Sequence, residues 1–114
     1  MALKTIVKVG NISNLSDARY CSGMGVQYLG FSLDPVNENY VDPETLKSIE
    51  DWVVGPMIVG EFSSSDHNTI KDSIHRYDID AMQISDLDVL EDLSKIKLPI
   101  ILDLDISIFQ NLDL

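Results

Sequence analysis

The chain has 114 residues, a length that predicts a single domain, taken here as residues 1–114. Hydrophobic residues make up 45% and charged residues 24%, a balance typical of globular rather than disordered proteins. The formal net charge of -11 disfavours nucleic acid or an anionic membrane surface as a partner. The same charge is unfavourable for a phosphorylated substrate, although it also serves solubility.

Membrane insertion and secretion are not indicated. No apolar run approaches the ~20 residues that a membrane-spanning helix needs, and the first four residues lack an apolar signal core. The single cysteine, Cys21, cannot form an internal disulfide and has no cysteine or histidine pair at metal-ligand spacing. We therefore predict a cytoplasmic protein without a structural metal site.

Short β-branched segments alternate with segments of helical spacing along the chain. Strands are expected over residues 5–9, 27–32, 57–62, 80–85 and 99–106. Helices are expected from Asn14 or Ser16 to Met24, from Pro43 with Asp42 as its cap, from Asp66 to about Tyr77, and over 86–95. Residues 108–114 fit the start of a fifth helix.

This βα repetition predicts an α/β fold with parallel strands and right-handed crossovers. Two arrangements fit the pattern equally well. One is an open five-stranded sheet with helices on both faces, and the other is an incomplete (β/α)8 barrel with all helices on one face.

Five ordered motifs resemble one enzyme family. The segment Val7-Lys-Val-Gly-Asn-Ile-Ser-Asn-Leu-Ser-Asp-Ala18 is similar to the opening Val-Lys-Ile-Cys-Gly-Ile-Thr-Asn-Leu-Glu-Asp-Ala motif of phosphoribosylanthranilate isomerases, a tryptophan-biosynthesis family. Four further matches follow in the family's order, at Gly25–Phe31, Asn39–Glu44, Val59–Phe62 and Ile79–Ser85. The resemblance runs from Thr5 to about Ile106 and implies about five units of a TIM-barrel-like half barrel.

The same resemblance implies that the isomerase chemistry is lost. The family's general-base cysteine falls on Gly10, which has no ionisable group, and Cys21 in the following helix does not replace it. The loop arginine that holds the anthranilate carboxylate falls on Asn39, and the histidine of the fourth strand falls on Ser85. The family's general-acid aspartate and phosphate loops belong to later strands, beyond Leu114. We expect no catalytic residue and no cofactor.

Polar residues at the predicted carboxyl ends of the strands form the best candidate pocket. Its expected members are Gly10, Asn11, Asn39, Glu61, Ser85, Asp103 and Asp105, with Asp86 nearby. Asp103 and Asp105 should share one face of a strand, where two carboxylates could bind a cation or share a proton. Two other interpretations stay open: solvation at an open edge, and an interface with a basic partner.

Other polar groups favour structural roles. His67 and His75 fall at the two ends of the predicted third helix, away from the strand ends, which favours a surface position. The cluster at residues 63–66 is explained equally well by anion binding and by a helix cap.

Three functions compete. The favoured one is a non-catalytic isomerase relative with a binding or assembly role. The second is an isomerase-derived enzyme that uses the acidic strand ends or is completed by a second polypeptide, and the third is a part of a longer barrel. Exposed strand edges predict a homo-oligomer or a complementary barrel half as partner, beside a small-molecule ligand.

Overall fold

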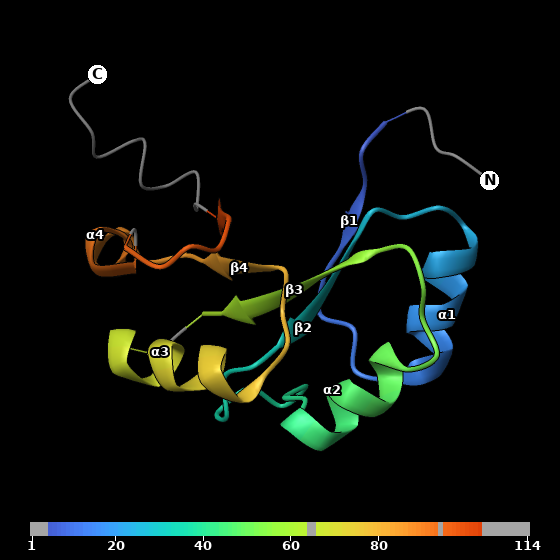
Figure 1. Cartoon of the computed structure of the whole chain (residues 1–114), viewed down its shortest axis with the longest axis horizontal. Coiled ribbons are helices and arrows are strands. Elements are labelled where there is room, and N and C mark those ends of the chain that lie inside the picture. The colour runs from blue at the N-terminus through green and yellow to red at the C-terminus, as the bar shows by residue number, and fades with distance from the viewer. Residues whose placement is uncertain (1–4, 64–65, 94, 104–114) are drawn as a thin grey trace.

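The computed structural model describes residues 5–63, 66–93 and 95–103. Strands and helices alternate along these residues (Figure 1). The strands are β1 (Lys8–Val9), β2 (Tyr28–Ser32), β3 (Met57–Phe62), β4 (Ala81–Ile84) and β5 (Ile100–Leu102). The helices are α1 (Leu15–Gly23), α2 (Pro43–Glu50), α3 (His67–Arg76) and α4 (Leu90–Leu93), with a 3-10 turn at Leu87–Val89.

The five strands form one sheet in the order of the chain, and every neighbouring pair is parallel. When consecutive parallel strands are neighbours and all crossovers have the same hand, every helix falls on the same face. Figure 1 shows this result, with α1 to α4 following one another around the outer side of a curled sheet. The fold is therefore a partial TIM-barrel-like half barrel, and the alternative of an open sheet covered on both faces is wrong.

Side chains point alternately to the two faces of the sheet, and this separates an apolar outer face from a polar inner face. Leu29 and Phe31 of β2, with Met82 of β4, are fully buried in the hydrophobic core under the helices. The side chains that point to the inner face include Glu61 of β3 and Gln83 of β4, which are paired in register and line a pocket. Burial of each large core side chain contributes about 1.5–3 kcal/mol, so the outer face holds the half barrel together and leaves the inner face available.

The helix starts follow the sequence signals. Asn14, Asp42 and Asp66 each accept a hydrogen bond from the backbone N–H three residues on. These bonds satisfy N–H groups that a helix leaves unpaired at its start. Hydrogen bonds from the Thr45 side chain and N–H lower the carboxyl pKa of Asp42, and those from the Thr69 N–H and side chain lower the pKa of Asp66. The predicted cap at Asp42 is confirmed, and Asn14 rather than Ser16 caps α1.

Three predicted elements differ from those observed. The helix expected over 86–95 is a 3-10 turn followed by the four-residue α4, because the Asp86 carboxylate accepts the Asp88 N–H and forms a local turn. The strand expected from residue 5 is only two residues long, since the Val7 N–H donates to the side chain of Gln27. The last strand is seen over Ile100–Leu102, while residues 104–106 and 108–114 lie outside the described part of the chain.

Candidate functional site

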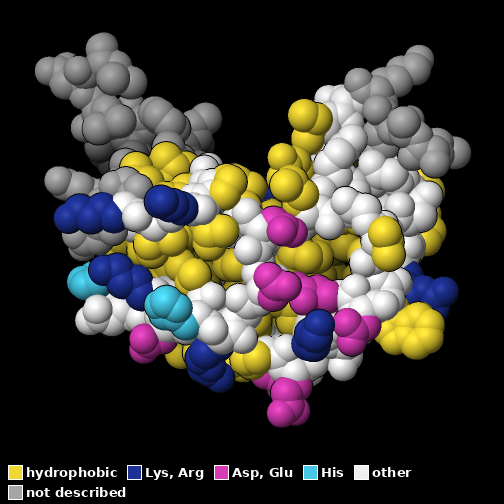
Figure 2. Space-filling view, in the orientation of Figure 1, with side chains coloured by type: hydrophobic (Ala, Val, Ile, Leu, Met, Phe, Trp, Pro, Cys, Tyr) yellow, Lys and Arg dark blue, Asp and Glu magenta, His cyan; other side chains and the backbone are white. Residues whose placement is uncertain are grey.

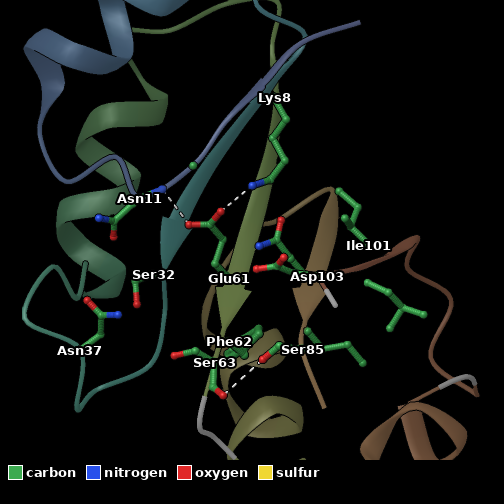
Figure 3. A pocket seen from close by; sticks show the side chains of 14 residues that line it. Lys8, Asn11, Ser32, Asn37, Glu61, Phe62, Ser63, Ser85, Ile101 and Asp103 are labelled. Carbon is green, nitrogen blue, oxygen red and sulfur yellow. Dashed lines mark hydrogen bonds and ion pairs between the residues drawn. The ribbon is translucent and has the colours of Figure 1, made fainter. Parts of the chain in front are cut away.

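A pocket of about 510 Å³ lies at the carboxyl ends of the strands, on the inner side of the half barrel (Figure 3). This is the end at which parallel barrels build their sites, because the loops that follow the strands meet there. The described residues that line it are Lys8, Gly10, Asn11, Ser32, Asn37, Glu61, Phe62, Ser63, Gln83, Ile84, Ser85, Ile101, Leu102 and Asp103.

Glu61 is the best-connected side chain of this pocket. Its Oε2 accepts a hydrogen bond from the Lys8 ammonium at 2.5 Å, and its Oε1 accepts one from the Asn11 backbone N–H at 2.8 Å. Figure 3 shows the carboxylate projecting from β3 between these two partners. The Lys8 and Glu61 side chains are only 22% and 15% exposed, so the ion pair is screened less by solvent than a surface pair would be.

Two glycines make room for this carboxylate. A Cβ atom on Gly10 would lie 2.5 Å from Glu61 Oε2, and one on Gly30 would meet the same oxygen and Cδ of Glu61. Real Cβ atoms essentially never come so close to a neighbour. The lack of a side chain at Gly10 and at Gly30 therefore leaves the space that the Glu61 carboxylate occupies.

The loop after β1 bends sharply next to the carboxylate. Asn11 has φ 58°, in the left-handed region that few residues other than glycine and asparagine adopt. The bend aims the Asn11 N–H at Glu61, and the Ile12 N–H then donates to the Gly30 carbonyl at 2.9 Å, which joins the loop to β2.

Further polar groups come from the loops after β2 and β3. The Ser32 side chain is 4% exposed and faces the pocket from the end of β2. Asn37 lies on the same side in Figure 3, and its side-chain oxygen accepts the Asn39 N–H at 2.8 Å. Across the pocket, the Ser85 hydroxyl donates to the Ser63 carbonyl at 3.4 Å.

The structure brings together five of the seven predicted pocket residues: Gly10, Asn11, Glu61, Ser85 and Asp103. Asn39 is not in the described lining, because the turn at residues 37–40 presents Asn37 instead. Asp105 lies outside the described residues, so its expected pairing with Asp103 stays a prediction.

Several polar lining residues were not predicted from the sequence, above all Lys8, Ser32, Asn37 and Gln83. For Lys8 and Gln83, the alternation of side chains along a strand was a signal that could have identified them. Lys8 precedes Gly10 by two residues and Gln83 precedes Ser85 by two, so each shares the face of a residue already chosen.

The other polar groups considered from sequence are elsewhere. His67 and His75 belong to α3, and neither they nor Asp86 are among the described lining residues. Over residues 5–63, 66–93 and 95–103, no group of three or more His, Cys, Asp or Glu side chains could hold a metal ion. None of the helices within the described part of the chain is long and apolar enough to cross a membrane.

The fold and pocket define a parallel α/β half barrel with a polar site at its carboxyl end. No family model matches the chain, and no curated protein matches it. Solved structures do. Phosphoribosyl anthranilate isomerase from Thermus thermophilus superposes with a TM-score of 0.75 at 22% identity, over 86% of this chain and 50% of that one.

Two further structures agree. The isomerase from Thermotoga maritima gives a TM-score of 0.70 at 20% identity, over 89% of this chain and 62% of that one. TrpF from Jonesia denitrificans gives 0.76 at 15% identity, over 94% and 54%. The described half barrel therefore has a phosphoribosylanthranilate isomerase-like fold, and it spans between 50% and 62% of the length of these three structures.

Proposed function

We propose that this chain is a non-catalytic protein of isomerase-like fold, with a role in binding or assembly. One observation carries the proposal. At the position where the isomerase motif has its general-base cysteine, this chain has Gly10, and the space beside it is filled by the Glu61 carboxylate. Without an ionisable side chain at position 10, the proton acceptor of the isomerase motif is lost.

Glu61 is a poor substitute for that acceptor. Both of its oxygens accept hydrogen bonds, from the Lys8 ammonium and from the Asn11 N–H. Each oxygen keeps a second lone pair, but these two bonds fix the direction in which the carboxylate points. A general base must also reach the proton directly or through one water, whereas Glu61 points at its own protein partners.

Two other positions support the loss of activity. The residues aligned with the family's loop arginine and strand histidine are Asn39 and Ser85, and neither carries a charge. One positioned acid or base contributes typically ~10²–10⁴-fold to the rate, so these replacements leave little beyond weak binding.

The test is an isomerase assay with phosphoribosylanthranilate, run beside an authentic isomerase. We expect no turnover above the buffer rate from the wild-type chain, and none from Gly10→Cys, because Glu61 obstructs the new thiol. Circular dichroism must show that both proteins are folded. A kcat/KM within about 10²-fold of the authentic enzyme would overturn the proposal.

A second candidate function is suggested by the fraction of each compared structure that the chain covers. A protein that spans 50–62% of an isomerase could act as the N-terminal part of a longer or two-chain enzyme. Mixing the chain with the C-terminal half of an authentic isomerase tests this. Turnover that depends on both components would favour this candidate over the non-catalytic one.

Assembly is the other part of the proposal. Over the described residues, β1 and β5 each pair with one neighbouring strand, and unpaired strand edges attract further strands. One similar structure consists of monomers generated from the dimeric phosphoribosylanthranilate isomerase of Thermotoga maritima. We expect a homo-oligomer by light scattering at micromolar concentration, and a monodisperse monomer would contradict this expectation.

A further inference from the structure

The charges of the pocket are unbalanced toward the negative. Lys8 is the one basic side chain among the described residues that line it, and its ammonium is bound to Glu61. These two charges cancel locally. Asp103, exposed at the end of β5, then leaves the described lining with a net negative charge. From the described lining, an anionic ligand would meet two carboxylates and no cation that is free of an ion pair.

Two uncharged polar groups of the described lining, on β2 and β4, differ from Asn37 and Ser85, whose side chains already bond to the protein. Among the described residues, neither the Ser32 hydroxyl nor the Gln83 amide has a hydrogen-bond partner. Ser32 as a residue is 4% exposed, yet its hydroxyl is not an enclosed unsatisfied atom, so it opens into the pocket. A ligand hydroxyl in the pocket can therefore bond to it without displacing a protein partner.

The chemistry of these groups suits a small, richly hydroxylated molecule. Hydroxyls and side-chain amides each both donate and accept, as ligand hydroxyls do, and such groups line the pocket on both the β2 and the β4 sides. The Asn11 amide extends this set at the tip of the β1 loop. A volume of about 510 Å³ lies within the usual range for small-molecule sites.

We infer that the pocket binds a small polyhydroxylated ligand without an anionic group, of the free-sugar or sugar-alcohol class, and discriminates against sugar phosphates. The inference rests on the proposed binding role and gives it a ligand class. The Lys8–Glu61 pair sets the selectivity, because it removes from the site the one described cation that a phosphate would use.

The experiment is a titration of the ¹⁵N-labelled full chain with ribose, ribitol and ribose 5-phosphate at matched ionic strength, monitored by amide NMR. We expect saturable shifts of the Gln83 and Asn37 side-chain signals with the two neutral probes, at millimolar affinity, and binding of the phosphate at least about tenfold weaker. Equal or tighter binding of ribose 5-phosphate would overturn the inference. So would the absence of saturable binding by either neutral probe up to about 100 mM.

Two variants locate the binding. Ser32→Ala and Gln83→Leu should each weaken ribose binding at least about fivefold, since each removes a group that the ligand satisfies. Asn68→Ala, an exposed amide on α3, is the matched control and should leave the affinity unchanged. Unaltered affinity in Ser32→Ala would contradict the site even if Gln83→Leu failed to fold.

The outcome is independent of the isomerase assay. If the chain shows no turnover and also lacks the predicted selectivity for neutral sugars, only the ligand class is wrong. If the chain prefers neutral sugars but turns over phosphoribosylanthranilate, only the proposed non-catalytic role is wrong.

Discussion

Glu61 occupies the space that any side chain at position 10 would need, since a Cβ on Gly10 would lie 2.5 Å from Oε2 of Glu61. The far end of a glutamate can usually move aside. Here it is held by the Lys8 ammonium and the Asn11 N–H, so displacement means breaking hydrogen bonds that the pocket cannot easily replace. Position 10 and position 61 are therefore coupled in energy as well as in space.

A double-mutant cycle measures this coupling. Gly10→Ala should lower the free energy of unfolding by about 1–3 kcal/mol, the usual range for overpacking, whereas in a Glu61→Ala background the same change should cost much less. Urea denaturation of the four proteins gives the values. Gly23→Ala is the control, because nothing lies within 4 Å of its Cβ, and this change in α1 should be neutral or stabilising. Additive effects at positions 10 and 61 would refute the coupling.

The sequence predicted the strand–helix alternation because it depends on local periodicity and caps, such as Asp42 before Pro43. It could not choose between an open sheet and a half barrel. That choice depends on which strands pair, and the pairing is set by the contacts between helices and the outer face of the sheet. Family motifs, which carry this long-range information indirectly, pointed to the half barrel.

The candidate site was predictable where a strand end could be located. Glu61 and Ser85 end recognisable strands and do line the pocket. Asn37 was missed because its place depends on the hydrogen bonds of a turn, which no periodicity reveals. The Lys8–Glu61 pair joins residues 53 apart, and only the register of β1, β2 and β3 brings them together.

The Lys8–Glu61 pair should stabilise the fold more than an exposed ion pair does. Lys8→Met leaves a largely buried carboxylate without its cation and should cost about 1–3 kcal/mol in the free energy of unfolding. The control is Lys47→Met, which breaks a 3.4 Å pair with Asp51 whose side chains are 71% and 60% exposed. It should change stability by less than about 0.5 kcal/mol. Equal effects of the two substitutions in urea denaturation would show that burial does not strengthen the pocket pair.

The Ser32 hydroxyl should matter for ligand binding and not for stability. Because it opens into the pocket and bonds to no described residue, Ser32→Ala should leave the free energy of unfolding within about 0.5 kcal/mol of wild type in the absence of ligand. Ser48→Ala, on the exposed side of α2, is the control and should stay within about 0.5 kcal/mol of wild type. A clear loss of stability in Ser32→Ala would mean that the hydroxyl already has a structural partner.

Glu50 should make stability depend on pH near neutrality. Burial raises its carboxyl pKa from 4.5 to about 7, and the neighbouring Asp78 charge adds to the effect, while Lys47 opposes it. Its Oε1 is buried without a hydrogen-bond partner. Glu50 lines a second hollow, separate from the candidate site, together with Asp51, Asp78 and Asp80. Acidic side chains gather in the middle of the face seen in Figure 2.

A pKa that is higher in the folded chain than in the unfolded one means that the folded chain holds its proton more tightly. The resulting stabilisation is fully present below the unfolded pKa of 4.5 and is lost as the pH rises through about 7. Glu50→Gln keeps the neutral form at every pH. It should therefore remove this dependence and raise stability at about pH 8 by roughly 1 kcal/mol, a value reduced for solvent screening of a partly exposed group.

Urea denaturation across this pH window tests the assignment, with Glu44→Gln on the exposed face of the same helix as control. The control should retain the wild-type dependence on pH, because Glu44 does not share the buried acidic surroundings of Glu50. If Glu50→Gln and wild type lost stability in parallel between about pH 5 and 8, the titrating group would lie elsewhere.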